Sequence, residues 1–255
     1  MRAKLDSAPS IRSRCARLAT RGVVYVAFGE RFVAEAAYSA RSLRQHCPGL
    51  PAVLFTDKPV ADAPFDDVKV VEVGHIRAKV DLLAQSPFEQ TLYIDSDTRV
   101  VRDLRDVFDV LGRFDLAMAH DFARKRATMA SRIPEYAAIP YAFSEFNGGV
   151  ILYGRSPGAT RFLELWRQRF HQYKEQTQGW DQASLRVAAW ESGAQILTLP
   201  PEFNVRSEGV RRRVGKSVAA GTNPGVMEPR ILHWHGLHEE KWWHRFSPKY
   251  RGFQY

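Results

Sequence analysis

The sequence predicts one α/β domain with a mostly parallel central sheet flanked by helices. Apolar runs of strand length alternate with a helical pattern in the first half of the chain, which is typical of a parallel sheet. Several of these runs end in polar residues, as strands at a ligand-binding edge do. At 255 residues and 45% hydrophobic, the chain fits either one large domain or two small ones. We interpret residues 22–245 as a single folded domain.

The first three strands and the helix between them follow from hydrophobic patterning. Residues 23–28 (VVYVAF) form a continuous apolar run, as in a strand buried on both faces. Apolar residues then recur at helical spacing over residues 33–43, until a Pro-Gly pair ends the helix. Residues 52–55 and 68–73 are two further apolar runs. The order strand, helix, strand, strand is the usual beginning of a parallel α/β sheet.

A fourth strand leads into two carboxylates separated by one residue, in the stretch TLYIDSDTRVV of residues 91–101. If the chain stays extended there, Asp95 and Asp97 lie on one face, about 7 Å apart. Such carboxylates repel each other unless a cation lies between them, and Mg²⁺ or Mn²⁺ prefers oxygen ligands. A polar turn without further role fits these residues equally well. We expect the pair to share one crevice with residues 28–29 and 56–57, beyond the strand ends.

Two helices are expected around this strand. Residues 77–84 mix basic and apolar side chains, and they would bring Arg77 and Lys79 to the rim of the crevice. Residues 103–111 carry acidic side chains early, as the first turn of a helix does. The two helices would therefore lie on either side of the acidic pair along the chain.

Two long segments lack a clear secondary-structure pattern. A fifth strand, residues 116–119, ends just before Asp121, and residues 122–145 then show little periodicity. A loop of that length in a compact domain is usually functional or mobile. Residues 206–229 are rich in glycine and cations, and they could close over an anion or form a solvated loop. The sequence favours neither alternative.

The second half of the domain alternates strands and helices again. Residues 147–153 begin with Asn-Gly-Gly, where the glycines are either turn residues or room for a ligand beside the backbone. Ser156-Pro157 starts a helix with serine as N-cap, and the apolar residues that follow it are core. Residues 182–188 form another helix, and residues 196–199 and 231–232 are late strands.

The composition indicates where the protein is located, but it does not identify the ligand. The net charge of +9 and pI near 9.7 predict attraction to anions, and nucleotides, nucleic acid, acidic glycans and anionic membranes all fit. Part of the charge lies in residues 1–21, which we expect to be a flexible basic tail. Cys15 and Cys47 are too few for a disulfide framework or a zinc cluster. The sequence has no apolar run that would span a bilayer and no signal-peptide centre, so we expect a cytoplasmic location.

Taken together, the motifs resemble the metal-dependent GT-A glycosyltransferases, most closely the glycosyltransferase family 8 type and its nucleotide-diphospho-sugar transferase relatives. The likeness spans about residues 23–243. It rests on segments in the family's order: the strand-helix opening, SPFEQTLYIDSDTRV, FDLAMAHD, EFNGGVILY, GWDQASL and HWHG. Each is weak alone, and the ordered set is specific. It implies one Rossmann-like GT-A domain over 22–245, with tails at 1–21 and 246–255.

The resemblance implies a metal site. Asp95 and Asp97 match the DxD pair of the family, with Asp95 also near the ribose. His233 matches the late histidine that completes the protein ligands of the metal. His235 is a rival ligand, although the His-x-x-Gly spacing of the family favours His233. The implied cofactor is Mn²⁺ or Mg²⁺.

The resemblance also implies the donor site. Positions that contact the nucleotide or the sugar in the family correspond here to Ala27, Phe28, Lys79, Asp95, Asp121, Asn147 and Lys241. The first two would lie beside the base, Lys79 would face the nucleotide or the sugar, and the pair Asp121 and Asn147 would lie near the sugar. Asp181 and Gln182 match the catalytic pair that flanks the reactive carbon.

One departure from the family concerns the diphosphate. The family usually has His-x-x-Gly-x-x-Lys, with the lysine on the diphosphate, whereas this chain has Glu239 at that position. Either Lys241 reaches back, or an arginine of residues 206–216 takes over, or phosphate binding is weak.

The resemblance implies an enzyme of polysaccharide biosynthesis that moves a sugar from a nucleotide-diphosphate sugar, with a UDP-sugar favoured, to a glycan or glycolipid. It implies retention of the anomeric configuration. From their aromatic and cationic side chains, we expect residues 122–145 and 242–245 to meet the acceptor, and a packed, structural tail is the alternative. We expect no nucleic-acid partner, and contact with the inner membrane surface is the alternative to a free cytoplasmic location. The residues support this chemistry independently, because a divalent ion neutralises the charge on a leaving diphosphate.

Other functions remain open at this point. A phosphohydrolase of the haloacid dehalogenase type also has an Asp-x-Asp after a strand, but usually on the first strand, whereas this pair follows the fourth. A nucleotidyltransferase shares the metal chemistry, yet it typically opens with a Gly-rich basic loop where this chain has VAFGERF. An inactive homologue would keep the motifs. A non-enzymatic binder of nucleic acid or glycan leaves Asp95, Asp97 and His233 unexplained.

Overall fold

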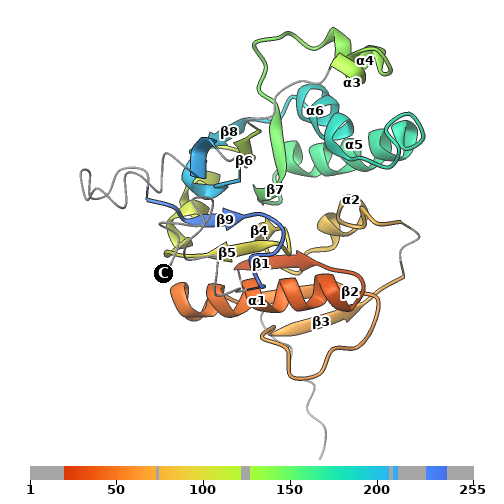
Figure 1. Cartoon of the computed structure of the whole chain (residues 1–255). Coiled ribbons are helices and arrows are strands. Elements are labelled where there is room, and N and C mark those ends of the chain that lie inside the picture. The colour runs from red at the N-terminus through yellow and green to blue at the C-terminus, as the bar shows by residue number, and fades with distance from the viewer. Residues whose placement is uncertain (1–19, 73–74, 122–126, 207–208, 212–227, 240–255) are drawn as a thin grey trace, which may run out of the picture.

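The computed structural model describes residues 20–72, 75–121, 127–206, 209–211 and 228–239 of the chain, and Figure 1 shows how they are arranged. Strands form a seven-stranded sheet and a separate two-stranded sheet. The strands of the large sheet are β1 (Arg21–Val26), β2 (Ala52–Thr56), β3 (Asp67–Val70), β4 (Gln90–Ile94), β6 (Leu116–His120), β7 (Phe146–Tyr153) and β8 (Ile196–Leu199). The strands of the small sheet are β5 (Thr98–Val100) and β9 (Ile231–His233).

The large sheet has the order β3-β2-β1-β4-β7-β6-β8. Neighbouring strands from β3 to β4 are parallel, as are β6 and β8, whereas β7 runs antiparallel to both of its neighbours. The predicted α/β class with a mostly parallel sheet flanked by helices is confirmed. The orientation of β7 could not be read from its apolar run, since a buried strand has the same pattern in either direction.

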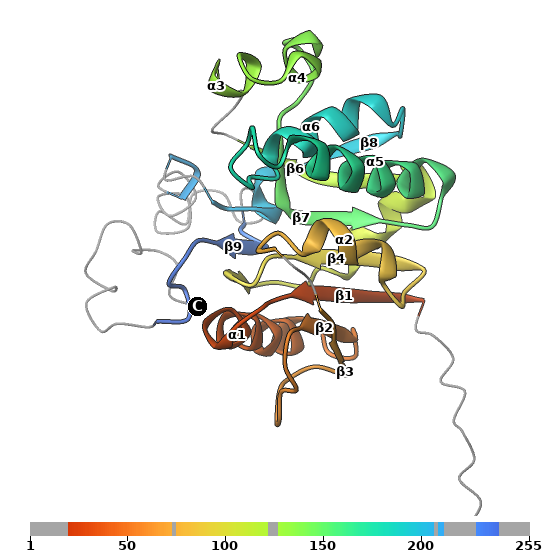
Figure 2. The same cartoon turned by 90° about the vertical axis from the view of Figure 1, so that its right-hand side faces the viewer.

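Helices cover both faces of the large sheet (Figure 2). The α-helices are α1 (Glu30–His46), α2 (Lys79–Leu82), α3 (Ala127–Ala130), α4 (Pro134–Ala138), α5 (Pro157–Tyr173) and α6 (Gln182–Glu191). Helix α1 lies on one face of the sheet and α5 and α6 lie on the other, whereas α4 packs on α6. The 3-10 helices are η1 (Leu83–Gln85), η2 (Arg105–Gly112) and η3 (Pro201–Phe203).

Two hydrophobic cores lie on opposite faces of the sheet because side chains alternate along each strand. On β1, Val23 and Tyr25 belong to the core under α1, whereas Val24 belongs to the core under α5 and α6. The Ser156 hydroxyl accepts a hydrogen bond from the Ala159 backbone N–H, so serine is the predicted N-cap of α5.

Several local expectations change in the structure. Strand β4 ends at Ile94, and a tight turn instead of extended chain carries Asp95 and Asp97 into β5. The stretch expected to be one long loop contains α3 and α4, which are too short to give a periodic pattern. The helix expected at residues 103–111 is the 3-10 helix η2.

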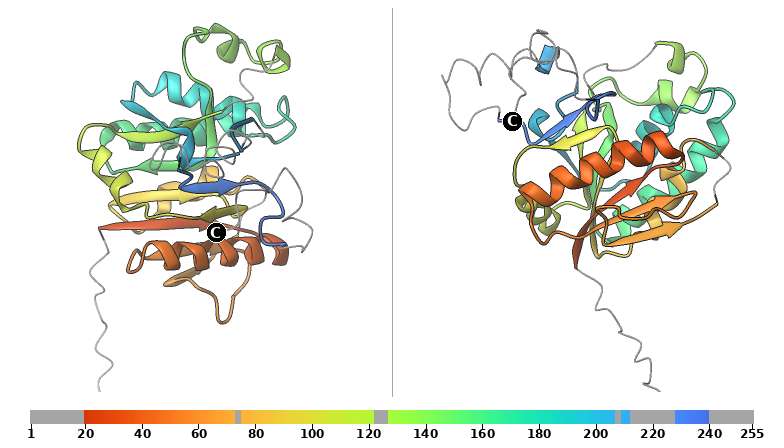
Figure 3. Two further views of the ribbon diagram at one scale, coloured as in Figure 1. Left: turned by 60° about the vertical axis from the view of Figure 1, so that its left-hand side comes forward. Right: turned by 60° about the horizontal axis from the view of Figure 1, so that its bottom comes forward.

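The last strand has an unexpected partner. Strand β9 pairs with β5 in antiparallel register and not with the large sheet. Figure 3 shows β9, in blue, beside β5, with α1 close to both. The structure therefore returns a late segment of the chain to the end of β4, where the acidic pair lies.

The predicted loop at residues 206–229 and the two predicted tails fall largely outside the described residues. Within the part that the structure describes, no helix combines the length and the apolar character needed to cross a bilayer.

Candidate functional site

A cleft of about 460 Å³ lies beyond the C-terminal ends of β1 and β4. Every predicted site residue within the described part of the chain lines it: Ala27, Phe28, Lys79, Asp95, Asp97, Asp121, Asn147, Asp181, Gln182 and His233. Lys241, predicted to bind the diphosphate, lies outside the described residues. These side chains come from seven separate parts of the chain, so the fold brings together every predicted residue that the structure describes.

One part of the predicted crevice is wrong. Thr56 is fully buried, and Asp57 lines a neighbouring hollow and not the cleft. The Asp57 carboxylate accepts a hydrogen bond of 2.9 Å from the Gly29 N–H, where glycine permits a φ of +82°. Asp57 therefore holds the turn between β1 and α1 and does not face the cleft.

Asp95, Asp97 and His233 form a cluster with ligand atoms that all lie within 4.8 Å of one another. The His233 Nε2 atom is 3.1 Å from Asp97 Oδ1 and 3.6 Å from Asp95 Oδ2. Asp97 is only 7% exposed and His233 only 1%. Two carboxylates and one imidazole suit a hard divalent cation with some tolerance for nitrogen, as Mn²⁺ has.

The tautomer of His233 follows from Asn204. The Asn204 Nδ2 donates to Asn147 Oδ1 at 2.9 Å, so the Asn204 oxygen is the atom that lies 2.8 Å from His233 Nδ1. His233 therefore donates its Nδ1–H to Asn204, and Nε2 is the ring atom directed at the two carboxylates, where a metal ion can take the place of its proton. This is the arrangement that orients a histidine as a metal ligand.

Asn204 was not predicted from the sequence. Its one signal is its place shortly after the strand at residues 196–199, where polar residues gather at a ligand-binding edge. The chain of contacts continues through Asn147, whose Nδ2 donates to Asp121 Oδ2 at 3.2 Å. Amide groups thus connect the predicted metal ligand to a predicted sugar contact.

Charge–charge contacts keep both aspartates of the cluster ionised. Burial by itself would raise the pKa of Asp97, but His233 and His235 lower it well below its usual range. Burial likewise opposes ionisation of Asp95, and the nearby Lys79 and His233 outweigh it, so the pKa of Asp95 is lowered. The Tyr93 hydroxyl also donates a hydrogen bond to the Asp95 carboxylate.

His235 touches the cluster from outside. Its Nδ1 atom lies 2.9 Å from Asp97 Oδ2, and the hydrogen bond to this carboxylate raises the pKa of His235. The His235 side chain is 69% exposed, whereas that of His233 is 1% exposed and faces both aspartates. This geometry favours His233 over His235 as the third ligand.

Lys79 joins the two ends of the cleft. The ammonium group lies 3.2 Å from Asp95 Oδ1 and 3.4 Å from Asp181 Oδ2, and it donates to the Gly148 carbonyl at 2.9 Å. Burial would lower the pKa of Lys79, but Asp95 and Asp181 raise it above its ordinary value. A fixed positive charge therefore lies between the predicted metal ligand and the predicted catalytic pair.

The glycines at the start of β7 leave room for these side chains. A Cβ atom on Gly149 would lie 2.3 Å from the His233 ring and 2.7 Å from Asp95 Oδ2. Both glycines lie inside the strand, so they are not turn residues. The absence of a side chain at Gly149 is what allows the histidine and the aspartate to approach the strand.

Gln182 is held by a buried carboxylate that the sequence analysis missed. The Gln182 Nε2 atom donates to Glu145 Oε1 and to the Phe146 carbonyl, each at 2.7 Å. Burial raises the pKa of Glu145, and the hydrogen bond from Gln182 and the charge of Arg186 partly offset this effect. Both amide hydrogens are used on the protein side, so the Gln182 oxygen is the end that faces the cleft.

Arg77 and Trp180 form the rim beside Asp181. The Arg77 Nε atom is 3.7 Å from Asp181 Oδ1, and the guanidinium lies 5.1 Å from the centre of the Trp180 ring. Trp180 is 51% exposed, and it lines the cleft together with Ile76, which is 78% exposed. A flat aromatic face is therefore open to solvent next to the predicted catalytic pair.

Comparison with known proteins defines the fold. No family model and no curated protein sequence matches the chain. The galactosyltransferase LgtC, solved with donor and acceptor sugar analogues, is similar with a TM-score of 0.58 and 16% identity, over 85% of this chain and 87% of LgtC. The chain has the GT-A glycosyltransferase fold. GlyE from Streptococcus pneumoniae TIGR4 has a TM-score of 0.56 and 18% identity, over 84% of this chain and 54% of GlyE.

A third GT-A structure is similar over nearly its whole length. Mouse xyloside xylosyltransferase 1 has a TM-score of 0.55 and 15% identity, over 84% of this chain and 97% of that protein. At identity this low, the likeness shows the GT-A architecture alone. The chemistry of this chain depends on its own side chains.

Proposed function

We propose that this protein is a metal-dependent glycosyltransferase of the family 8 type. It would move a sugar from a nucleotide-diphosphate sugar, with a UDP-sugar favoured, to a glycan or glycolipid. The observation that carries the proposal is the cluster of Asp95, Asp97 and His233 at the cleft of a GT-A fold, with ligand atoms within 4.8 Å of one another. A phosphohydrolase or nucleotidyltransferase would need the same metal chemistry but not the sugar-facing pair Asp181 and Gln182.

The donor set fits Mn²⁺ or Mg²⁺. Asp95 and Asp97 are ionised, His233 directs Nε2 at both carboxylates, and Gly149 leaves space beside both kinds of ligand. When bound, a divalent ion neutralises the negative charge that develops on the leaving diphosphate. The three side chains would hold the ion, and Asn204 would keep His233 in the required tautomer.

The remaining cationic groups of the cleft would orient the diphosphate. Lys79 is fixed between two carboxylates, and Arg206 lines the cleft from the segment that follows η3. The family lysine is replaced here by Glu239, so Arg206 supports the alternative in which an arginine of residues 206–216 takes over its role. Guanidinium groups match phosphate geometry with paired hydrogen bonds.

Retention of the anomeric configuration is part of the proposal. Gln182 would turn its carbonyl oxygen toward the sugar, where it stabilises the positive charge that builds on the reactive carbon. An amide is a poor nucleophile, and Asp181 is held by Lys79 and Arg77. This arrangement supports attack on the face from which the diphosphate leaves, with the diphosphate accepting the proton of the acceptor hydroxyl.

The acceptor would approach past Trp180 and Ile76. Both side chains are exposed on the rim of the cleft beside Asp181, and aromatic faces stack well on the apolar faces of sugars. A glycolipid acceptor would bring the protein to a membrane surface as a peripheral contact. The predicted acceptor contacts at Trp242–Arg245 lie outside the described residues.

Nucleotide release from a panel of UDP- and GDP-sugars, with Mn²⁺ and with EDTA, tests the proposal. We expect release with one nucleotide only, abolished by EDTA, and reduced at least about 1,000-fold by Asp97→Ala, because the metal charge is lost. The matched control is Asp109→Ala, which removes an exposed carboxylate paired with Arg21. Release of inorganic phosphate or pyrophosphate in place of the nucleoside diphosphate, or wild-type transfer by a folded Asp97→Ala variant, would contradict it.

A further inference from the structure

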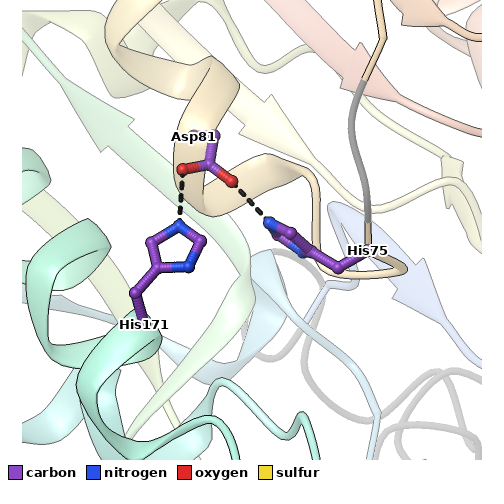
Figure 4. A group of neighbouring side chains, drawn as sticks. All are labelled: His75, Asp81 and His171. Carbon is purple, nitrogen blue, oxygen red and sulfur yellow. Dashed lines mark hydrogen bonds and ion pairs between the residues drawn. The ribbon is translucent and has the colours of Figure 1, made fainter.

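A second cluster of metal-ligating side chains lies outside the lining of the cleft. His75 precedes α2, Asp81 lies within α2, and His171 comes from the last turns of α5 (Figure 4). The His75 Nε2 atom is 2.5 Å from Asp81 Oδ2, and the His171 Nε2 atom is 2.9 Å from Asp81 Oδ1. The ligand atoms all lie within 4.8 Å of one another. Figure 4 shows the two rings directing a nitrogen to opposite oxygens of the same carboxylate.

We propose that His75, Asp81 and His171 form a binding site for a transition-metal ion of the Zn²⁺ class. Zn²⁺ takes imidazole nitrogen and carboxylate oxygen at about 2.0–2.2 Å, which places tetrahedral ligand atoms about 3.3–3.6 Å apart. The present nitrogen–oxygen separations of 2.5 and 2.9 Å are hydrogen-bond contacts. An ion takes the place of the two hydrogen bonds to Asp81: each ring binds as a neutral imidazole, with the lone pair of Nε2 on the metal and its one proton on Nδ1. The rings move outward by less than about 1 Å.

The ligand set differs from that of the cleft in a way that selects the ion. The cleft cluster has two carboxylates and one imidazole, whereas this cluster has two imidazoles and one carboxylate. Imidazole suits Zn²⁺, Co²⁺, Ni²⁺ and Cu²⁺, and carboxylate-rich sites suit Mg²⁺ and Mn²⁺. The two sites therefore differ in which ion they prefer, although Co²⁺ or Zn²⁺ alone can occupy both.

The site is partly preorganised and has an open side. The His75 side chain is 13% exposed, and its ring packs on Phe170 with a centroid distance of 5.0 Å. The His171 side chain is 43% exposed, so an ion and a water ligand can reach the cluster from solvent. Arg167 Nε donates to Asp81 Oδ1 at 2.9 Å and can orient the carboxylate when its other oxygen binds metal.

The site lies next to the residues that serve the cleft, although the inference does not rest on the proposed function. Arg77 and Lys79 lie between His75 and Asp81 along the chain and line the cleft. A metal ion would link this short segment to α5 through the side of the segment that faces away from the cleft. Metal binding would thereby hold Lys79 in place between Asp95 and Asp181.

The test is metal titration of untagged, EDTA-treated protein that carries Asp95→Asn and Asp97→Asn, so that the cleft cluster cannot bind. Co²⁺ is the spectroscopic probe and Zn²⁺ the competitor. We expect one equivalent of Co²⁺ with the visible absorption of a nitrogen-ligated ion, displaced by Zn²⁺ with a Kd below about 10 μM. Adding His171→Ala should weaken binding at least about tenfold, whereas His46→Ala, a histidine outside both clusters, should leave it unchanged.

Thermal unfolding gives a second readout that does not depend on enzyme activity. Zn²⁺ at a hundredfold excess over its Kd should raise the Tm of the background variant by about 5–10 °C, and His171→Ala should remove this rise. If the background variant does not fold, the wild-type protein should bind two equivalents and His171→Ala one. Binding weaker than about 100 μM, or equal binding with and without His171, would mean that the cluster is a hydrogen-bonded link between α2 and α5 and would overturn the proposal.

Discussion

Replacing Glu145 by glutamine tests whether Gln182 acts through its carbonyl oxygen. Glu145 Oε1 accepts the hydrogen bond from Gln182, and Oε2 accepts from the Tyr136 hydroxyl at 3.1 Å and from Arg186 Nη1 at 3.3 Å. A guanidinium only donates, so the new glutamine would keep its oxygen on Arg186 and turn its NH₂ group to Gln182. Two donors would then face each other. The Gln182 amide relieves this contact by turning over, at the cost of its hydrogen bond to the Phe146 carbonyl, and it then presents its own NH₂ group to the cleft.

The expected effect on the rate exceeds the expected effect on folding. Turning a fixed dipole away from a developing positive charge costs about 1.5–3 kcal/mol, which is about 10–100-fold in kcat. The KM for the donor should change little, because the sugar carries no such charge in the ground state. Arg186 keeps the carbonyls of Pro140, Phe143 and Ser144 as acceptors, so the free energy of unfolding should fall by about 1–3 kcal/mol, less than for a broken buried pair.

A double-mutant cycle distinguishes positioning from general damage. If Glu145 acts through Gln182, Glu145→Gln should lower kcat in the wild-type background and have no further effect in a Gln182→Ala background. The matched control is Glu191→Gln. Glu191 lies on α6, as Gln182 does, and its carboxylate is 2.8 Å from Arg169 of α5, so the substitution weakens this contact. It should lower Tm without lowering kcat. An equal fall in kcat in both backgrounds, or an unchanged kcat in folded Glu145→Gln protein, would refute the reasoning.

Three further predictions concern the cleft. Asn204→Leu should weaken Mn²⁺ binding about 10–100-fold, measured by calorimetry, because His233 loses the partner that fixes its tautomer; unchanged affinity would exclude this role. Lys79→Met should lower kcat at least about 100-fold in steady-state assays of a folded variant, since two carboxylates then face each other without a cation; a wild-type rate would show that the charge is dispensable. Gln182→Ala should keep measurable activity, and NMR should show a product of retained configuration; an inverted product, or a sugar attached to Asp181 in mass spectra, would exclude same-face attack.

The strands of the sheet could be predicted because burial on both faces leaves a continuous apolar run. Residues 23–28, 52–55 and 116–119 each have that run, and each corresponds to a strand. The bounds of these three strands differ by one or two residues, because backbone hydrogen bonding and not hydrophobicity sets where a strand begins and ends. Strand direction has no such signature, which is why the antiparallel direction of β7 and the pairing of β5 with β9 were not predicted.

The residues of the candidate site also fall into a group that the sequence could predict and a group that it could not. Residues that follow a strand, such as Asp95 and Asp121, could be placed at the edge of the sheet from position alone. Glu145 and Asn204 act through other side chains and have no spacing to mark them. Thr56-Asp57 also lies at the end of a strand, but the Asp57 carboxylate accepts a hydrogen bond from the Gly29 N–H and does not face the cleft. Position at a strand end therefore predicts where a polar group lies and not which partner it takes.

The pairing of β5 with β9 explains why His233, and not His235, faces both aspartates. Strand β5 begins at the residue after Asp97, and its antiparallel register places Thr98 opposite His233. The Trp234 N–H also donates to the Asp97 carbonyl at 3.1 Å. Backbone hydrogen bonds thus set the separation of the acidic turn and the histidine before any ion is bound. Because β9 ends at His233 and the chain turns, His235 loses the alternation of a strand and reaches Asp97 alone, from the exposed side.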